Sequence, residues 1–462
     1  MTATVTNPAR RVRSRRVWGW MAFDWASQPF YTLCLTFIFG PYFAATLSQS
    51  LMDGGLVETA ADARAQAVWS WTQTGIGLAI ALTAPLLGAM ADRSGNRISW
   101  VAAFCALYVA GTAGLWLMAP DASATTVTLL AFAVAMIGAE YATIFTNAML
   151  PGLVAWDQTG RVSGTGYALG YAGGVVALIV FLALFADDES GRTMLGAAPA
   201  LGLDGAAREG TRFVGPFSAL WFAVFMVPFF VWVREPRRAG QAVSLGLAWR
   251  DVAALLRAVP GRRSLMAWLA GSMLYRDALA ALYAFGGTYA ALVLDWEVTQ
   301  VGVFGIVSAI TAAVASWIGG GLDARHGPKP VIVGAVLVLT GVVVVLCLMS
   351  REMILGIPLP PGSPVPDAVF YAVGAAIGGA GGALQAASRT MMVRHAEPGR
   401  ATEAFGLYAL SGKATAFLAP LLIAVATTVT GSARLGVFPV ALLFLAGLVL
   451  LRWVDPHGDV DR

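Results

Sequence analysis

Twelve apolar runs constrain the fold of this chain more than any other feature of its sequence. They cover residues 18–47, 66–91, 97–119, 124–152, 162–186, 215–234, 265–294, 299–322, 330–350, 367–393, 402–430 and 434–453. A helix of about 20 apolar residues spans the hydrocarbon core of a bilayer. Of the 462 residues, 58% are hydrophobic and only 12% are charged, a balance that a water-soluble domain does not sustain. The sequence therefore predicts an all-α membrane protein with twelve transmembrane helices.

The distribution of basic residues predicts how these helices are oriented. If both termini are cytoplasmic, 21 of the 30 basic residues fall in cytoplasmic segments, 6 in external segments and 3 within helices. Basic loops remain on the cytoplasmic side of a membrane. We therefore expect a cytoplasmic N-terminus (1–17), a six-helix bundle (18–234), a cytoplasmic linker (235–264), a second six-helix bundle (265–453) and a cytoplasmic tail (454–462). The preference for arginine over lysine is typical of a GC-rich bacterial genome, so the membrane is expected to be a bacterial inner membrane.

The linker carries an amphipathic pattern. Its apolar residues recur at helical spacing, whereas Arg250 and Arg257 share another face; the apolar positions are Leu245, Trp249, Val252, Leu256 and Val259. This pattern is typical of a helix that lies in the membrane interface. We expect a lipid-surface helix, with a docking site for a regulatory protein as the alternative.

Several function classes are excluded by the residues that the chain lacks. Its three cysteines and three histidines lie at unrelated spacings, which gives neither a disulfide framework nor a metal motif. The sequence has no nucleophile–base set and no phosphate loop, so we expect no enzyme activity. We expect no cofactor, no metal and no nucleic-acid partner, and a monomer in the lipid bilayer.

A short polar stretch, residues 88–97, separates the second and third apolar runs. It reads G-x-x-x-D-R-x-G-x-R, with Gly88, Asp92, Arg93, Gly95 and Arg97 in the defined positions. Gly88 permits a close approach of two helices and Gly95 a tight reversal, while Asp92 can bind a helix N-terminus or an arginine. The stretch resembles the signature of the major facilitator superfamily in the loop between its helices two and three.

A weaker copy of this stretch occurs in the second half of the chain. It contains Gly319, Asp323, Arg325, Gly327 and Lys329, with one residue inserted between the acid and the second glycine. The spacing from Asp92 to Asp323 is half the chain, so an internal duplication into two bundles is the economical explanation. We expect the first loop, together with Asp323 and Arg325, to control conformational gating.

Six ionisable residues lie inside the predicted membrane helices: Asp24, Glu140, Arg276, Asp277, Arg389 and Lys413. Each costs about 2.5–3.5 kcal/mol on an insertion scale unless it faces a cavity or a partner. The superfamily resemblance implies that helices one, four, seven and ten line the substrate path, and five of the six lie on those helices. For Asp24 a helix cap, and for Arg389 an extension of its side chain to the cytoplasm, are the structural alternatives.

Polar and aromatic residues accompany these charges and complete the predicted substrate and proton pathway. They are Trp25, Gln28 and Tyr31 beside Asp24, Tyr141 and Asn147 beside Glu140, and Gln385 one turn before Arg389. Aromatic walls with a few polar anchors suit a small polar ligand. We expect Glu140, with Asp277 as the alternative, to carry a coupling proton. We also expect Lys413 to pair with a carboxylate of the second half, Asp277 ahead of Glu403, and only secondarily to bind the solute.

Longer segments narrow the resemblance to one branch of the superfamily. The first apolar run contains A-F-D-W-A-S-Q-P-F-Y-T, and the segment of Gln385 and Arg389 reads G-G-A-L-Q-A-A-S-R. These resemble the autophagy-related vacuolar amino-acid effluxers of fungi and their bacterial relatives, the unknown major facilitator family, although Phe23 and Ser27 depart from that branch's usual Tyr and Asn. The resemblance implies a secondary active transporter that moves a small polar solute by alternating access, with proton coupling and amino-acid export as the finer expectations. A non-transporting membrane receptor or assembly factor is the alternative.

Overall fold

Long helices form nearly the whole of the described structure. The computed structural model describes residues 8–187, 191–235, 241–296 and 298–459. Eleven helical stretches in these ranges are long and apolar enough to cross a membrane. A further helix, α11 (Arg263–Leu294), has 32 residues. The prediction of an all-α membrane protein is therefore confirmed. Parts of the predicted N-terminus (1–7), linker (236–240) and tail (460–462) lie outside the described residues.

The helices group into two compact units. The first unit comprises Met1–Thr83, Ser94–Thr146 and Leu169–Gln241. Within it, α8 packs against α1 and α4, and α9 packs along α1. Its helices, some of which continue into the second unit, are α1 (Pro8–Pro29), α2 (Phe39–Asp53), α3 (Glu58–Ser94), α4 (Arg97–Gly114), α5 (Thr125–Met149), α6 (Thr159–Leu184), α7 (Glu209–Arg212), α8 (Val214–Phe225) and α9 (Val227–Trp232).

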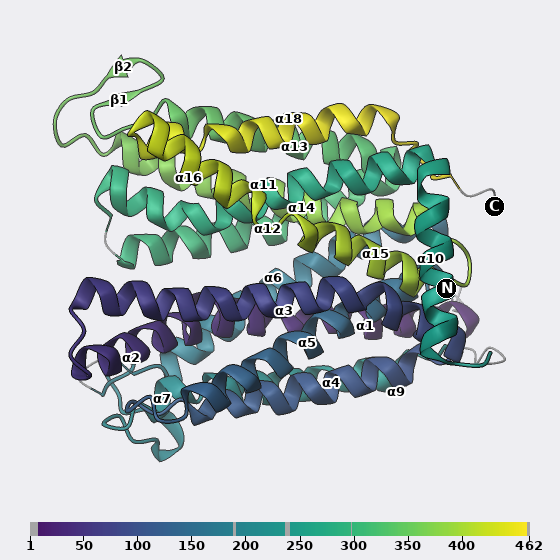
Figure 1. The fold of residues 1–462 in the computed structure, drawn as a ribbon, viewed down its shortest axis with the longest axis horizontal. Helices are drawn as coiled ribbons and strands as arrows, with labels where there is room; N and C mark the ends of the chain where they lie inside the picture. The colour runs from purple at the N-terminus through teal and green to yellow at the C-terminus, as the bar shows by residue number, and fades with distance from the viewer. Residues whose placement is uncertain (1–7, 188–190, 236–240, 297, 460–462) are drawn as a thin grey trace, which may run out of the picture. The chain divides into compact units, whose positions relative to one another are not determined.

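The second unit comprises Ala84–Arg93, Asn147–Ala168 and Ala242–Arg462. Within it, α14 packs against α12 and α13, α18 packs against α11 and α13, and α10 runs across the ends of neighbouring helices (Figure 1). Besides α11, its elements are α10 (Leu245–Ala258), α12 (Val298–His326), α13 (Pro328–Cys347), α14 (Val365–His395), α15 (Ala401–Ala414), α16 (Leu418–Thr430), α17 (Ala433–Gly436), α18 (Phe438–Leu450) and the antiparallel strands β1 (Met353–Ile354) and β2 (Ile357–Pro358).

Short helices connect several of these elements. One is a π-helix, η1 (Phe30–Phe37). The others are 3-10 turns at η2 (Leu115–Leu117), η3 (Leu150–Gly152), η4 (Trp156–Gln158), η5 (Ala200–Gly202), η6 (Val259–Gly261) and η7 (Leu451–Trp453).

Two segments from the first half of the sequence belong to the second unit. Ala84–Arg93 is the end of α3, and Asn147–Ala168 runs from the end of α5 into α6. Both precede the linker in the chain, yet both pack with helices that follow it. The second unit therefore contains contacts between the two halves of the sequence.

Several apolar runs that the sequence analysis treats as single helices are interrupted in the structure. The first run is divided after Pro29, and breaks also precede Pro228, Pro420 and Pro439. Proline lacks an N–H and cannot donate to the carbonyl four residues earlier. For Pro29, the carbonyl four residues earlier is that of Trp25, which instead accepts a hydrogen bond from Trp221 Nε1 over 3.4 Å. The predicted spans therefore lie at the right positions, but the helices are interrupted at these prolines and not continuous as predicted.

Candidate functional site

Asp92 lies in the last turn of α3 and binds the start of α15. Thr402 Oγ1 donates to one carboxylate oxygen over 2.7 Å, and the backbone N–H of Glu403 donates to the other over 3.0 Å. The first N–H groups of a helix lack partners within it and carry partial positive charge, so a carboxylate is stabilised there. Gly88 permits this approach, because a Cβ at this position would lie 2.6 Å from Thr402 O. We call this contact of α3 with α15 the first seam.

The neighbouring residues of the loop bind the linker. Arg93 makes a bidentate ion pair with Asp251 on α10. Its Nε donates to Oδ2, and its Nη2 donates to Oδ1 over 2.9 Å. Gly95 ends α3 in the left-handed conformation at φ 65°, which glycine adopts without steric cost. Within the first unit, the buried Arg97 donates to Glu235 over 2.7 Å. Both linker acids in the described residues are therefore bound by arginines of this loop.

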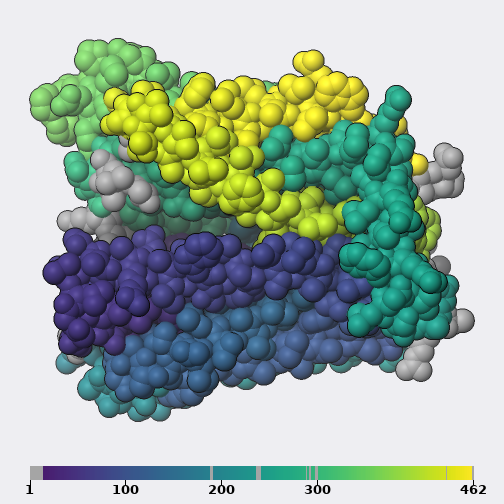
Figure 2. Space-filling view, in the orientation of Figure 1, coloured from purple at the N-terminus to yellow at the C-terminus, as the bar shows by residue number. Residues whose placement is uncertain are grey.

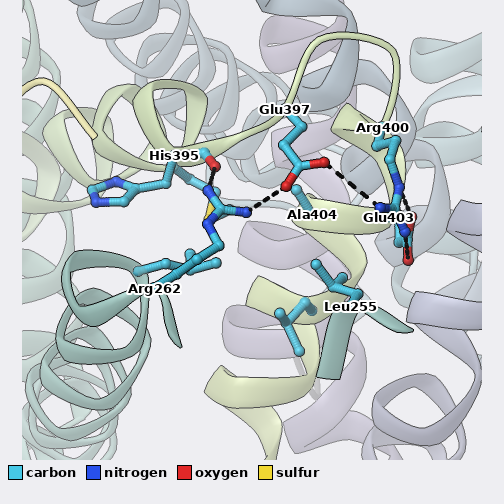
Figure 3. A pocket seen from close by; sticks show the side chains of 10 residues that line it. Leu255, Arg262, His395, Glu397, Arg400, Glu403 and Ala404 are labelled. Carbon is cyan, nitrogen blue, oxygen red and sulfur yellow. Dashed lines mark hydrogen bonds and ion pairs between the residues drawn. The ribbon is translucent and has the colours of Figure 1, made fainter. Parts of the chain in front are cut away.

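A chain of ion pairs continues from the first seam (Figure 3). Arg400 binds Glu403 through two nitrogens, at 2.8 and 2.9 Å, and approaches Glu397 at 3.6 Å. Arg262 donates to Glu397 over 2.9 Å, and Arg400 also donates to the backbone carbonyl of Asp251 over 3.3 Å. These charges surround a small pocket lined by Leu255, Arg262, Leu265, Met392, His395, Glu397, Arg400, Glu403, Ala404 and Leu407. Since its polar groups bond to one another, this pocket is better explained as part of the ionic network than as a solute site.

The start of α6 makes a second close contact, with α12. A Cβ at Gly160 would lie 2.5 Å from Asp323 Cγ, and one at Gly164 would lie 2.5 Å from Gly320 Cα. Only residues without side chains allow the helices to approach so closely. We call the contact of the start of α6 with α12 and α14 the second seam.

A buried arginine on α14 fastens the second seam. Arg389 is 3% exposed, and it donates through Nε to Ser163 Oγ over 2.9 Å and through Nη2 to Ser163 O over 2.7 Å. Its Nη1 donates to Asn147 Oδ1 over 3.2 Å, and its guanidinium lies 4.3 Å from the ring centre of Tyr167. The alternative in which Arg389 extends to the cytoplasm is therefore wrong. Arg389 and Asn147, which the sequence places separately on the predicted pathway, are in contact.

Asp323 is placed in the second seam without a comparable set of donors. It is 1% exposed, and neither carboxylate oxygen has a hydrogen-bond partner among the described residues. Thr390 and Arg394 lie near enough to Asp323 to favour its charged form, although Thr390 Oγ1 donates to Ala386 O over 3.4 Å and Arg394 Nη1 donates to Pro456 O over 2.8 Å. The carboxylate thus occupies the position of Asp92 in the repeat without its hydrogen bonds.

The remaining residues of the second loop have other contacts. Arg325 is exposed, and Lys329 donates to Val454 O over 2.8 Å, which attaches the C-terminal segment to the start of α13. Gly319 faces α14, where a Cβ would lie 3.0 Å from Ala383 Cβ. The basic residues of this loop therefore do not reproduce the pairing of Arg93.

Two residues of the predicted pathway are packing residues of the first unit. The Trp25 ring stacks on Trp221 with centroids 5.9 Å apart. Tyr141 is 2% exposed, stacks on Phe104 at 4.7 Å and forms a hydrogen bond with Thr83. Aromatic pairs of this kind are typical of helix packing. Their place in the pathway is therefore less well supported than that of their charged neighbours.

The other polar candidates are part-buried in the structure. Gln28 lies against α6, where a Cβ at Gly174 would be 2.9 Å from its Cγ. Tyr31 lies at the start of η1 and contacts Phe30 at 5.6 Å. Nine of the twelve predicted pathway residues are part-buried: Asp24, Trp25, Gln28, Tyr31 and Glu140 in the first unit, and Asn147, Arg276, Gln385 and Lys413 in the second.

Charged residues on α11 bind other groups than predicted. The Arg276 guanidinium lies 4.1 Å from the ring centre of Tyr408 and donates to its carbonyl over 3.1 Å. The buried Asp277 accepts a hydrogen bond from the backbone N–H of Ala419 over 2.9 Å. The predicted Asp277–Lys413 pair is therefore wrong. The interruption between α15 and α16 creates a new helix N-terminus, and its free N–H groups bind the carboxylate.

Sequence reasoning missed several partners that complete these contacts. Asp251 and Ser163 have no motif of their own, and Arg400 lies between two helices. One signal was available for Asp251, because Glu235 and Asp251 are the only acids in the arginine-rich linker segment 235–264. A lone acid among arginines can be expected to bind one, although the sequence does not indicate which.

The helical architecture and the two seams define a class of membrane protein, the transporters of the major facilitator superfamily. The fold resembles that of the human organic anion transporter MFSD10 (TETRAN), with a TM-score of 0.66, 16% sequence identity, and coverage of 96% of this chain and 100% of that one. Residues 13–459 match the family described as "Vacuole effluxer Atg22 like". The chain belongs to this family, which is one of transporters and not of enzymes.

Two relatives illustrate the breadth of the family. The uncharacterized MFS-type transporter YxiO of Bacillus subtilis (strain 168) is 22% identical over 451 residues, which are 96% of this chain and 95% of that protein. Autophagy-related protein 22-2 of Neosartorya fischeri is 21% identical over 319 residues. That alignment covers 64% of this chain and 49% of the fungal protein, so the chain matches about half the length of that relative. The predicted family resemblance is confirmed.

Proposed function

We propose that this protein is a secondary active transporter that exports a small polar solute, with amino acids as the first class to test, across a bacterial plasma membrane. Alternating access requires a set of contacts that forms at one membrane face and separates in the opposite state. The first seam supports this proposal most directly, because it joins segments from the two sequence halves through one carboxylate and two donors. A receptor or assembly factor would have less use for such a contact.

In this proposal the seams lie on the cytoplasmic side and hold that side closed. The arginines around them agree with this orientation, since basic residues remain cytoplasmic. Separation of the seams would release a bound solute or admit a new one. The linker would keep the two bundles joined while they move.

The effluxer description of the family supports export, and the fungal relatives bring amino acids into consideration. Asp24 and Glu140 are part-buried acids of the first unit, and Arg276 and Lys413 are part-buried basic residues of the second. Charged side chains inside membrane helices are expected in a protein that moves a charged or zwitterionic solute.

Transport in proteoliposomes tests this proposal. Purified protein is reconstituted, loaded with a radiolabelled amino-acid mixture and given a proton gradient, and solute movement is compared with that in empty liposomes. Movement that depends on the protein supports transport. If purified protein moves no member of amino-acid, sugar or organic-anion panels, but binds a solute, the receptor alternative replaces the proposal.

Glu140 is the residue that we propose for proton coupling. It is part-buried on α5, and an acid inside a membrane helix can carry a proton between two faces. Glu140→Gln should abolish accumulation driven by a proton gradient but retain solute exchange at a similar rate, because exchange needs no net proton movement. Glu58→Gln at the exposed start of α3 is the matched control and should change neither. Unimpaired accumulation in Glu140→Gln would assign coupling to another group.

A further inference from the structure

The linker helix α10 has one face packed against the protein and one that is open. Ala248, Val252 and Leu255 are 0%, 5% and 6% exposed, and Ala248 and Val252 pack against Ala89 at the end of α3. Val252 therefore belongs to the packed face, although the sequence analysis places it on the membrane face.

Two polar contacts fix how α10 is rotated about its axis. Asp251 holds Arg93 on α3, and its carbonyl accepts from Arg400 ahead of α15. Because residues on a helix follow one another at about 100°, fixing Asp251 and Val252 inward also fixes which residues point outward.

The outward face of α10 carries an apolar stripe. Leu245 and Trp249 are each 63% exposed, and Leu256 is 46% exposed. At about 100° per residue, the three lie within about 40° of one another, beside the packed face. The helix lies at the surface of the molecule in Figure 2. A tryptophan exposed to this degree next to two leucines is costly in water and suits the interface of a bilayer.

Arginines flank the apolar stripe on the side away from the protein. Arg250 and Arg257 are exposed and make no ion pair among the described residues. Arg234 and Arg263, before and after the helix, are exposed as well. Asp251, the acid of α10, is bound to Arg93. The exposed surface of α10 therefore has an apolar side and an adjoining side on which all the charges are positive.

We propose that α10 is a docking surface for the anionic lipids of the bilayer, in which Leu245, Trp249 and Leu256 enter the interface and Arg250 and Arg257 bind phosphate headgroups. Apolar burial combined with arginine–phosphate attraction is how interfacial helices bind anionic membranes. The partner is the lipid surface and not a protein, because the charged face of α10 carries only positive charge and the adjoining apolar stripe is narrow. This proposal does not depend on the transported solute.

Site-directed spin labelling in nanodiscs tests the docking. Cys34, Cys105 and Cys347 are first replaced by serine or alanine, and a nitroxide is attached through Trp249→Cys. The matched control is Ala254→Cys, which is also exposed but lies about 140° from Trp249 around the helix. The full-length protein is placed in nanodiscs of phosphatidylcholine alone or mixed equally with phosphatidylglycerol. Collision with oxygen and with the neutral complex of nickel(II) with ethylenediamine-N,N′-diacetate is then measured.

In the anionic nanodiscs, we expect the 249 label to collide with oxygen and to be protected from the nickel reagent, whereas the 254 label should remain open to nickel. Each arginine should contribute about a fivefold change in the ratio of docked to undocked helix. Arg250→Gln with Arg257→Gln should therefore reduce the protection of the 249 label to that seen in phosphatidylcholine. These two positions are exposed, so folding should be retained, and the oxygen collision rate at an additional label in α12 checks this.

Two results would overturn the proposal. If the 249 and 254 labels are equally open to the nickel reagent in both lipids, the stripe faces water or requires a protein partner. If the 249 label is protected equally in both lipids and in the double variant, the helix is held by apolar contact alone and the anionic-lipid assignment is wrong.

Discussion

The two seams derive from the same repeated sequence element but are held together differently. In the first seam, the carboxylate of Asp92 accepts two hydrogen bonds at the start of α15. In the second seam, the corresponding Asp323 is buried against Gly160 and has no hydrogen-bond partner among the described residues. The second seam is instead fastened by Arg389, which binds Ser163 and Asn147. A repeated sequence therefore preserved the position of the acid but not its interaction.

The difference has a physical consequence for how each seam opens. A carboxylate at a helix N-terminus is partly exposed to water when the helices separate, so its hydrogen bonds are exchanged for bonds to water at modest cost. Separation of the second seam would remove the donors of a buried arginine from three protein acceptors at once, Ser163 Oγ, Ser163 O and Asn147 Oδ1. We therefore expect Arg389 to contribute more to the closed arrangement than Asp92, and Asp323 to contribute least.

Arg389→Met should have the largest effect of the three changes. It removes the donor of three hydrogen bonds, to Ser163 Oγ, Ser163 O and Asn147 Oδ1, and each hydrogen bond from a charged group contributes about 1.5–3 kcal/mol. We expect a clear fall in the melting temperature, measured by intrinsic fluorescence in nanodiscs, and loss of transport. Both effects arise from the same seam.

Arg389→Lys is the matched control for this change. Lysine keeps the charge but cannot bind two acceptors in one plane or lie flat over Tyr167, so it should recover only part of the melting temperature. If Arg389→Met melts like the unchanged protein but no longer binds solute, Arg389 is a solute anchor, as its place in the predicted pathway suggests, and the second seam needs another explanation.

How far the sequence predicted these features depends on the range of the interaction. The helical membrane architecture follows from apolar runs, and the close approach at Gly88 follows from a glycine within a recognisable loop. The helix interruptions at Pro29 and Pro420 were also predictable from the sequence, because proline disrupts a helix, but they were not predicted. By contrast, Arg389 lies 226 positions from Ser163. No local pattern encodes such a pair, which exists only because helices from two halves pack together.

The predicted Asp277–Lys413 pair failed for a related reason. Opposite charges within a membrane helix bundle were expected to meet, but the interruption of the chain before Ala419 offered Asp277 backbone N–H groups. Sequence reasoning counts side-chain charges more readily than the unpaired backbone groups that a helix break creates. The sequence similarity between the two loops was also misleading, because it indicated equal roles for Asp92 and Asp323.

Asp92→Asn should have an intermediate effect that is confined to the first seam. Asparagine can accept one of the two hydrogen bonds but carries no charge for the helix N-terminus, and the coupling lost should be about 1–3 kcal/mol. Hydrogen–deuterium exchange reports this directly, because the backbone N–H of Glu403 is one of the two donors. Exchange at the start of α15 should rise roughly 5- to 150-fold, in proportion to that free energy.

Transport by Asp92→Asn should be lost while the equilibrium affinity for solute stays within several-fold of the original, since Asp92 acts on the seam and not on the solute. Asp92→Glu is a useful companion, because it keeps the charge but is one methylene too long for the space beside Gly88. An unchanged exchange rate at Glu403, together with normal transport, would remove the first seam from the gating mechanism.

Asp323→Asn makes the same chemical change at the equivalent position and should have the smallest effect. Asp323 is 1% exposed and its oxygens have no hydrogen-bond partner among the described residues, so the substitution removes no bond that the structure contains. A neutral amide is less costly than a carboxylate to bury in such a place, and any loss of stability should be under about 1 kcal/mol. The melting temperature should therefore be unchanged or slightly raised, and exchange at the start of α15 should not move. A fall in melting temperature or transport as large as that of Asp92→Asn would mean that Asp323 acquires donors in another state of the transporter. In that case the two seams would alternate in the use of the repeated acid, and the asymmetry described here would belong to one conformation only.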